Sequence, residues 1–170
     1  MRICLSGGAS LLLASCAAGA EVPAGDAPSL ELTGRVVDAA DILPAAYEAR
    51  LSDTLKSIKD ETSVQLVVAT TPDLKGETID DYSLKLANDW GIGNAERNDG
   101  LMILVAPRER KVRIEVGRGL ETAVTDGEAK RIIECDMIPH FRAGDYIRAL
   151  DAGVAGLKAE IKPLANRKAA

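Results

Sequence analysis

Two neighbouring segments carry different hydrophobic patterns, and together they limit the folds open to this chain. Residues 101–105, LMILV, are apolar at every position, which is typical of a central strand covered on both faces. In residues 112–116 apolar and charged side chains alternate, which indicates a half-buried strand. A short charged segment separates the two runs, so we predict an antiparallel pair, 101–105/111–117.

Elsewhere the periodicity predicts helices that alternate with strands. Residues 64–69 form a β-branched run typical of a buried strand, and 34–38 form a shorter apolar run. Apolar residues recur at helical spacing in four further stretches, and Pro139 is expected to end the third of these helices. We therefore predict an α/β fold: a three-layer α/β/α sandwich with a small mixed sheet of three to four strands and about four helices.

The first sixteen residues have the pattern of an export signal. Arg2 precedes an apolar segment that is too short to span a bilayer, and Leu13-Ala14-Ser15-Cys16 resembles a bacterial lipobox. We predict a lipoprotein signal peptide at 1–15 and lipidation of Cys16; an ordinary cleaved signal with a chance cysteine is the alternative. Residues 16–30 are expected to form the lipidated end and a flexible tether, 31–162 the folded domain and 163–170 a polar tail.

A lipid on Cys16 would anchor the domain in the cell envelope, facing the periplasm. Ala17 stands where some lipoproteins carry the Asp that retains them at the inner membrane, which favours the outer membrane. With Cys4 removed and Cys16 lipidated, Cys135 has no disulfide partner within the chain. The helical pattern around Cys135 predicts a buried, inert thiol.

Charge and motif spacing argue against several classes of function. The net charge of −5 is unfavourable for nucleic-acid binding, which needs a basic surface. Gly91 and Gly93 follow a helix, and Glu96 stands where a dinucleotide fingerprint requires its third glycine. No Gly-Lys-Ser/Thr phosphate loop occurs, and a single histidine, His140, allows neither a catalytic triad nor a zinc site with two imidazoles.

Acidic residues are expected to gather at one edge of the sheet. Because antiparallel neighbours place the start of one strand beside the end of the other, Asn98 and Asp99 should lie near residues 117–121. Asp126 could fold over the same edge, and Asp38, at the end of the first apolar run, could join it. Oxygen ligands of this kind suit calcium, or less well magnesium. The alternative is that these Asp side chains only cap turns and helices.

At this point the chain resembles the TPM domain family, named for a thylakoid acid phosphatase, a photosystem II repair protein and a levamisole-receptor modulator. The resemblance covers roughly residues 34–157 and rests on several short segments in the family's order. These segments are GRVVD (34–38), QLVV (65–68), IDDY (79–82), WGIG (90–93), NDG (98–100), RKVRIEVG (110–117), GLE (119–121), TD (125–126) and FRAGDY (141–146).

The resemblance implies an α/β/α sandwich with an acid-lined site at one sheet edge, where some relatives bind calcium; a plant member is described as an acid phosphatase. Carried over, the metal ligands would be Asp38, Asp99 and Asp126, with Asn98, Glu121 and Asp145 as weaker candidates. Two features depart from the family pattern. Thr122 stands where a glycine commonly follows Gly-Leu-Glu, and the N-terminal lipid would replace the C-terminal membrane helix of many bacterial members.

Two functions follow from this resemblance. The first is a non-catalytic, envelope-anchored binding or assembly module, whose calcium-stabilised edge docks a membrane or envelope protein. The second is a metal-dependent acid phosphatase acting on phosphomonoesters, in which Arg97 and Arg118 would hold phosphate. The Asp-x-Asp nucleophile spacing of many phosphatases is absent, since Asp38 is followed by Ala-Ala-Asp41. We favour the binding module and assign no catalytic residue.

Overall fold

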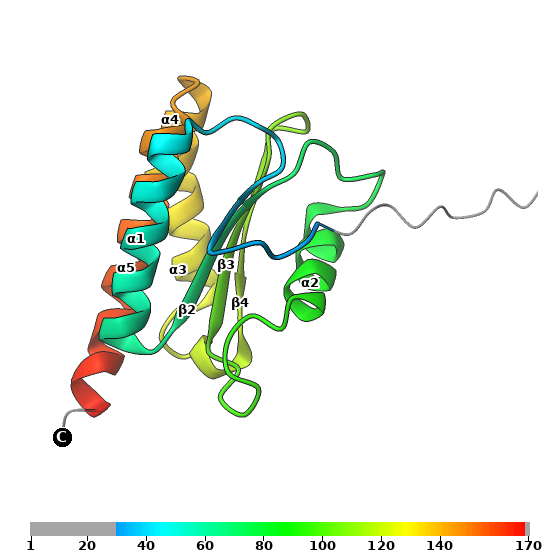
Figure 1. The fold of residues 1–170 in the computed structure, drawn as a ribbon. Helices are drawn as coiled ribbons and strands as arrows, with labels where there is room; N and C mark the ends of the chain where they lie inside the picture. The colour runs from blue at the N-terminus through cyan, green and yellow to red at the C-terminus, as the bar shows by residue number, and fades with distance from the viewer. Residues whose placement is uncertain (1–29, 169–170) are drawn as a thin grey trace, which may run out of the picture.

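A computed structural model describes residues 30–168 as one four-stranded sheet between two layers of helices (Figure 1). The strands are β1 (Val36–Asp38), β2 (Gln65–Thr70), β3 (Gly100–Ala106) and β4 (Lys111–Val116), in the spatial order β1-β2-β3-β4. β1, β2 and β3 are parallel, and β4 is antiparallel to β3. The predicted mixed sheet and its antiparallel pair are confirmed. The predicted signal peptide, Cys16 and most of the tether lie outside the described residues.

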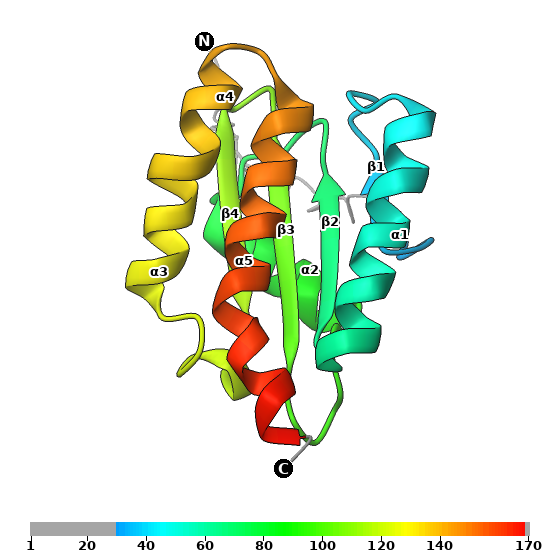
Figure 2. The same cartoon turned by 90° about the vertical axis from the view of Figure 1, so that its left-hand side faces the viewer.

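Four helical segments cover the sheet. α2 (Ile79–Asp89) lies on one face of the sheet, and α1 (Ala45–Thr62) and α5 (Tyr146–Lys168) lie on the other (Figures 1 and 2). The fourth segment shares the face of α1 and α5. It is formed by α3 (Asp126–Arg131), the π-helical η2 (Ile132–Met137) and α4 (Ile138–Arg142). A short 3-10 helix, η1 (Arg118–Leu120), follows β4. The predicted three-layer sandwich with about four helices is confirmed. No helix within the described residues is long and apolar enough to cross a membrane.

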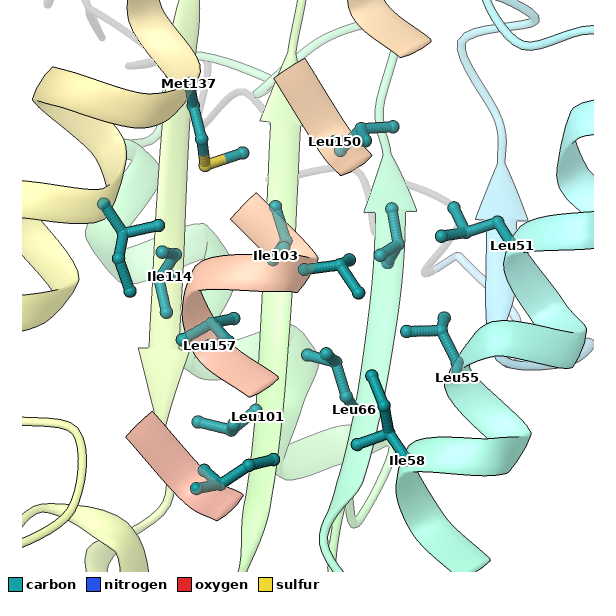
Figure 3. Packing of buried hydrophobic residues seen from close by; sticks show 14 of the residues in the cluster. Leu51, Leu55, Ile58, Leu66, Leu101, Ile103, Ile114, Met137, Leu150 and Leu157 are labelled. Atoms are coloured by element: carbon teal, nitrogen blue, oxygen red, sulfur yellow. The ribbon is translucent and has the colours of Figure 1, made fainter. Parts of the chain in front are cut away.

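Side-chain alternation along β3 explains why this strand is apolar at every position. Leu101, Ile103 and Val105 belong to the larger core cluster, which α1, α3 and α5 cover (Figure 3). Met102, Leu104 and Ala106 belong to a smaller cluster under α2. Because successive side chains of a strand point to opposite faces, a strand with helices on both sides needs apolar residues throughout.

β4 lies at the edge of the sheet and has one neighbouring strand, which explains its mixed pattern. Ile114 is buried in the larger core cluster, whereas Arg113 and Glu115 face the side of α2. Arg113 pairs with Asp80 of α2 at 2.9 Å, and the Ser83 hydroxyl donates to Glu115 Oε2 at 2.9 Å. Polar contacts therefore replace apolar packing where α2 crosses this strand.

Three details differ from the sequence-based expectations. Pro139 does not end the third predicted helix. Proline has no backbone N–H, and the π-helical segment before it changes the spacing of the backbone hydrogen bonds at this point. The same helix exposes Cys135, so the prediction of a buried thiol was wrong. α5 extends to Lys168, so most of the segment predicted to form a polar tail continues the last helix.

Candidate functional site

Two loops meet at the end of the sheet where β3 begins and β4 ends. The Gly117 N–H donates to the Gly100 carbonyl oxygen at 2.8 Å, and the Gly119 N–H donates to the Asn98 carbonyl oxygen at 3.0 Å. The expectation that Asn98 and Asp99 lie beside residues 117–121 is therefore confirmed. We call residues 90–99 and 117–121 together the loop pair.

Glycines allow the two backbones of the loop pair to touch. A Cβ atom on Gly119 would lie 1.8 Å from the Arg97 carbonyl oxygen, and one on Gly117 would lie 2.3 Å from the Asn98 carbonyl oxygen. Both distances are far below any normal contact between a carbon and an oxygen, so side chains are excluded at both positions. Gly117 and Gly119 therefore let the two loops lie directly against each other, which no residue with a Cβ atom would allow.

Asp99 stabilises the first loop from within. Its side chain is only 11 % exposed; Oδ1 accepts from the Asn94 N–H at 2.8 Å, and Oδ2 accepts from Arg97 Nε at 2.6 Å. The Asn94 side chain in turn accepts from the backbone N–H groups of Glu96 and Arg97. Both carboxylate oxygens of Asp99 therefore hold the loop in shape, and its charge is matched by a neighbouring guanidinium.

Asp38 lies at the opposite end of the sheet, so the expectation that it joins Asp99 was wrong. It pairs in register with Thr70, the last residue of β2, whereas Asp99 immediately precedes β3. β1, β2 and β3 are parallel, so Asp38, at the end of β1, lies level with the end of β3. Asp99 precedes the start of β3, and six residues at about 3.3 Å each place these two ends of the sheet about 20 Å apart. Asp38 accepts from the Leu43 N–H at 2.7 Å and from the Thr70 hydroxyl, which closes the β1–α1 loop.

The other predicted ligands are dispersed. Asp126 is exposed at the start of α3, where Thr125 and Glu128 form a capping box, and hydrogen bonds from Thr125 lower the pKa of Glu128. Glu121 is exposed after η1. Asp145 caps α5 by accepting from the Arg148 N–H at 2.9 Å. Within the described part of the chain, no three acidic, histidine or cysteine side chains gather where they could hold a metal ion.

The donors as arranged do not fit the calcium or magnesium site that the sequence suggested. The contacts agree instead with the alternative that Asp38, Asp99 and Asp145 stabilise turns and helix starts. Magnesium fits no better, because it needs several oxygen ligands at short, regular distances.

Calcium binding can be tested through Trp90, the only tryptophan, which lies at the end of α2 and donates from Nε1 to the Leu30 carbonyl oxygen. We expect its fluorescence to show no saturable change up to about 1 mM calcium, a range that includes most natural sites, because Arg97 already neutralises Asp99. A saturable change that disappears in Asp99→Asn would restore the calcium prediction. Asp126→Asn serves as the control for non-specific loss of charge.

A groove of about 340 Å³ borders the loop pair, and sequence reasoning missed it. It lies between α2 and β4; Leu84 and Ile92 line it on one side, and Asn98, Val116 and Arg118 on the other. Leu84 is 51 % exposed, the higher value of the two exposed large apolar residues in the described chain. The sequence did contain a signal, since Leu84 lies outside the apolar face that Ile79, Tyr82, Leu86 and Trp90 define on α2.

The two predicted phosphate ligands differ in their surroundings. Arg97 pairs with Asp99 through Nε, and its side chain is 55 % exposed. Arg118 lines the groove, is exposed and has no ion-pair partner among the described residues. They lie on the two loops that touch through Gly119, so one end of the sheet carries both guanidinium groups.

The mixed sheet, its two helical layers and the two loops in close backbone contact define a small α/β/α domain with a tightly packed loop surface at one end. A model of the TPM domain matches residues 36–160 of this chain. The chain belongs to the TPM domain family, as its sequence motifs indicated.

Solved structures agree with this family and fold. The N-terminal domain of a protein from P. gingivalis is 36 % identical and has a TM-score of 0.72, with 81 % of this chain and 90 % of that chain covered. The N-terminal domain of the cg2496 protein from Corynebacterium glutamicum (15 % identity, TM-score 0.61, 79 % and 83 % covered) shares the fold. The BA42 protein from Bizionia argentinensis does so as well (17 %, 0.64, 72 % and 83 %). A comparison with curated proteins found no match.

Proposed function

We propose that this TPM domain is a non-catalytic binding module of the cell envelope, which docks a membrane or envelope protein at the loop pair and the adjoining groove. The observation that carries the proposal is the close backbone contact between the loops, with Gly119 against the Arg97 carbonyl oxygen. A surface that is already ordered loses little conformational freedom when a partner binds, which favours affinity.

The chemistry around the groove suits a protein partner. Leu84 offers an exposed apolar side chain, and Asn98 and Arg118 add hydrogen-bond donors at the rim of the same groove. Apolar anchors within a polar rim, with arginine over-represented, are typical of protein–protein interfaces. The partner would place an apolar side chain against Leu84 and acidic or carbonyl groups against Arg118.

Envelope location is the part of the proposal that rests on sequence. The export signal at 1–15 and the lipobox cysteine, Cys16, would anchor the domain at a membrane surface facing the periplasm. Residues 16–30 would then act as a tether that lets the loop pair reach a neighbouring protein.

The phosphatase alternative receives less support from the contacts. A nucleophilic or metal-binding carboxylate must be available to the reaction. Both oxygens of Asp99 instead accept hydrogen bonds from its own loop, and those of Asp38 accept from the Leu43 N–H and from the Thr70 hydroxyl of β2. Arg97, one of the two expected phosphate ligands, is already paired with Asp99. The binding module therefore explains the arrangement more simply.

Site-specific crosslinking in the native envelope tests the docking surface. A photo-crosslinking amino acid in place of Asn88, which lines the groove, should join the full-length protein to one defined envelope protein. Adding Leu84→Asp should remove this product, because a carboxylate would have to be buried against the partner's apolar group. The measured quantity is the intensity of the crosslinked band on a denaturing gel.

Two controls make the result decisive. The same amino acid in place of Asp53, an exposed residue of α1 on the other side of the sheet, should give no such product. The melting temperature of the Leu84→Asp variant should stay close to that of the parent, because Leu84 is half exposed. A product that forms equally from Asp53, or that survives Leu84→Asp, would contradict docking at the groove.

A further inference from the structure

A second, larger cavity lies at the opposite end of β4. Its volume is about 730 Å³, within the range typical of small-molecule sites. It follows the free edge of the sheet: Ile79 of α2 lines it from one face, Val112 of β4 from the edge, and Phe141 and Tyr146 from the other face. The rings of Phe141 and Tyr146 meet edge to face with their centroids 5.6 Å apart.

The floor of this cavity is apolar and its charges are all positive. Ile133, Ile138, Phe141 and Tyr146 are half-buried on the helical side. Arg110, Lys111 and Arg142 also line the cavity, and no acidic residue does. The chain as a whole carries a net charge of −5, whereas the lining of this cavity contains three cations and no acid.

These three cations have no ion-pair partner among the described residues. Of the neighbouring acids, Asp145 pairs with Arg148 and Asp80 pairs with Arg113. Glu109 Oε1 accepts from the Leu74 N–H, and its buried Oε2 has no hydrogen-bond partner among the described residues. The positive charges that line the cavity are therefore free to pair with an anionic ligand, as far as the described residues are concerned.

Arg110 also occupies an unfavourable backbone position. Its φ is +55°, in the left-handed region, at the end of the turn that joins β3 to β4. Glycine or asparagine suits this position better, because a side chain with a Cβ atom is strained there. A glycine or asparagine at position 110 would therefore give a more stable turn, whereas the arginine found there adds a positive charge to the lining of the cavity.

From these observations we propose that the cavity binds a small amphipathic anion, an apolar chain or ring that ends in a carboxylate or phosphate. The apolar part would lie over Ile138, Phe141 and Tyr146, and the anionic group would face Arg110, Lys111 and Arg142. This site is distinct from the loop pair, because Lys111 is the first residue of β4 and the loop pair follows its last residue.

Binding of decanoate, followed by amide chemical shifts of the protein, tests this site. We expect saturable changes at Val112, Phe141 and Tyr146 with a dissociation constant below about 1 mM, and weaker binding as salt is added. Decyltrimethylammonium, which has the same chain with the opposite charge, should bind much more weakly, as should acetate, which has no chain. Decyl phosphate compared with decanoate distinguishes a phosphate from a carboxylate ligand.

Variants separate charge recognition from folding. Arg142→Gln and Lys111→Gln should each weaken decanoate binding by about three- to tenfold, as expected for partly screened charges. Arg110→Gly should weaken binding similarly while raising the melting temperature by about 2–4 °C, since it relieves the strained turn. Lys59→Gln, an exposed lysine of α1 outside the cavity, is the matched control and should leave the affinity unchanged.

Several results would overturn the proposal. These are equal binding of decanoate and decyltrimethylammonium, unchanged affinity in a variant that combines Arg110→Gly with Arg142→Gln, or no saturable change up to the solubility limit of decanoate. Association with anionic vesicles in the absence of decanoate binding would also overturn it, because the basic cluster would then recognise a membrane surface. Shifts at the same residues that depend on protein concentration alone would assign the cavity to a second copy of the chain.

Discussion

Replacement of Gly119 by Ala is expected to lower the free energy of unfolding by about 3 kcal/mol or more, one of the two largest single-residue effects in this domain. The new Cβ atom would lie 1.8 Å from the Arg97 carbonyl oxygen, which belongs to the backbone and cannot rotate away. The loops would have to separate, and the hydrogen bond from the Gly119 N–H to Asn98 would be lost. Thermal unfolding should show a melting temperature lower by roughly 10 °C.

Gly127→Ala is the matched control for this prediction. Gly127 lies in the first turn of α3, and the nearest atom to an added Cβ would be Thr125 Oγ1 at 3.8 Å, an ordinary contact. Alanine is also the better helix former, so this variant should be neutral or more stable by up to about 1 kcal/mol. Similar melting temperatures for Gly119→Ala and the parent would show that the loop pair adapts easily, and the rigid docking surface would lose its basis.

Leu157→Ala is expected to lower the free energy of unfolding by about 2–5 kcal/mol. Leu157 is fully buried on α5 and packs in the larger core cluster over the sheet (Figure 3). Truncation removes apolar contacts and leaves a cavity that the strands and helices around it cannot fully close. Urea denaturation monitored by circular dichroism measures the change through the transition midpoint, provided that the slope of the transition is unaltered.

Leu84→Ala provides the comparison within the same residue type. Its side chain is 51 % exposed, so truncation should change the free energy of unfolding by no more than about 0.5 kcal/mol. Equal destabilisation by the two substitutions would contradict the burial of Leu157 in the larger core cluster. Because truncation of Leu84 should leave the stability of the fold almost unchanged, its effect on partner binding can be measured separately from folding.

Much of the fold could be predicted because hydrophobic periodicity is a local property of the chain. β3 is apolar at every position and β4 alternates, and these two patterns predicted a central strand, an edge strand and their antiparallel pairing. The same pairing placed Asn98 beside residues 117–121, since a short connection leaves few alternatives. TPM motifs added the family, which the match over residues 36–160 confirms.

The candidate site was harder to predict because the position of an acid along the chain does not set its direction or its partners. Asp38 was expected beside Asp99, but the parallel orientation of β1 places it at the other end of the sheet. Cys135 was expected to be buried, but the π-helical segment turns it outward. The calcium prediction relied on acids gathering at one sheet edge and on the family resemblance, whereas hydrogen bonds show that several of these acids stabilise turns and helix starts.

By itself, the sequence determined the layers, the pairing of β3 with β4 and the family of this protein, because each depends on patterns within short stretches of residues. Only the tertiary structure decided which side chains meet. Gly119 lies against the Arg97 carbonyl oxygen, Leu84 and Arg118 line one groove, and Arg110 and Arg142 line one cavity; in each case the tertiary fold brings separate segments together. Such contacts depend on strand direction, helix phase and close backbone approach, which no local pattern contains.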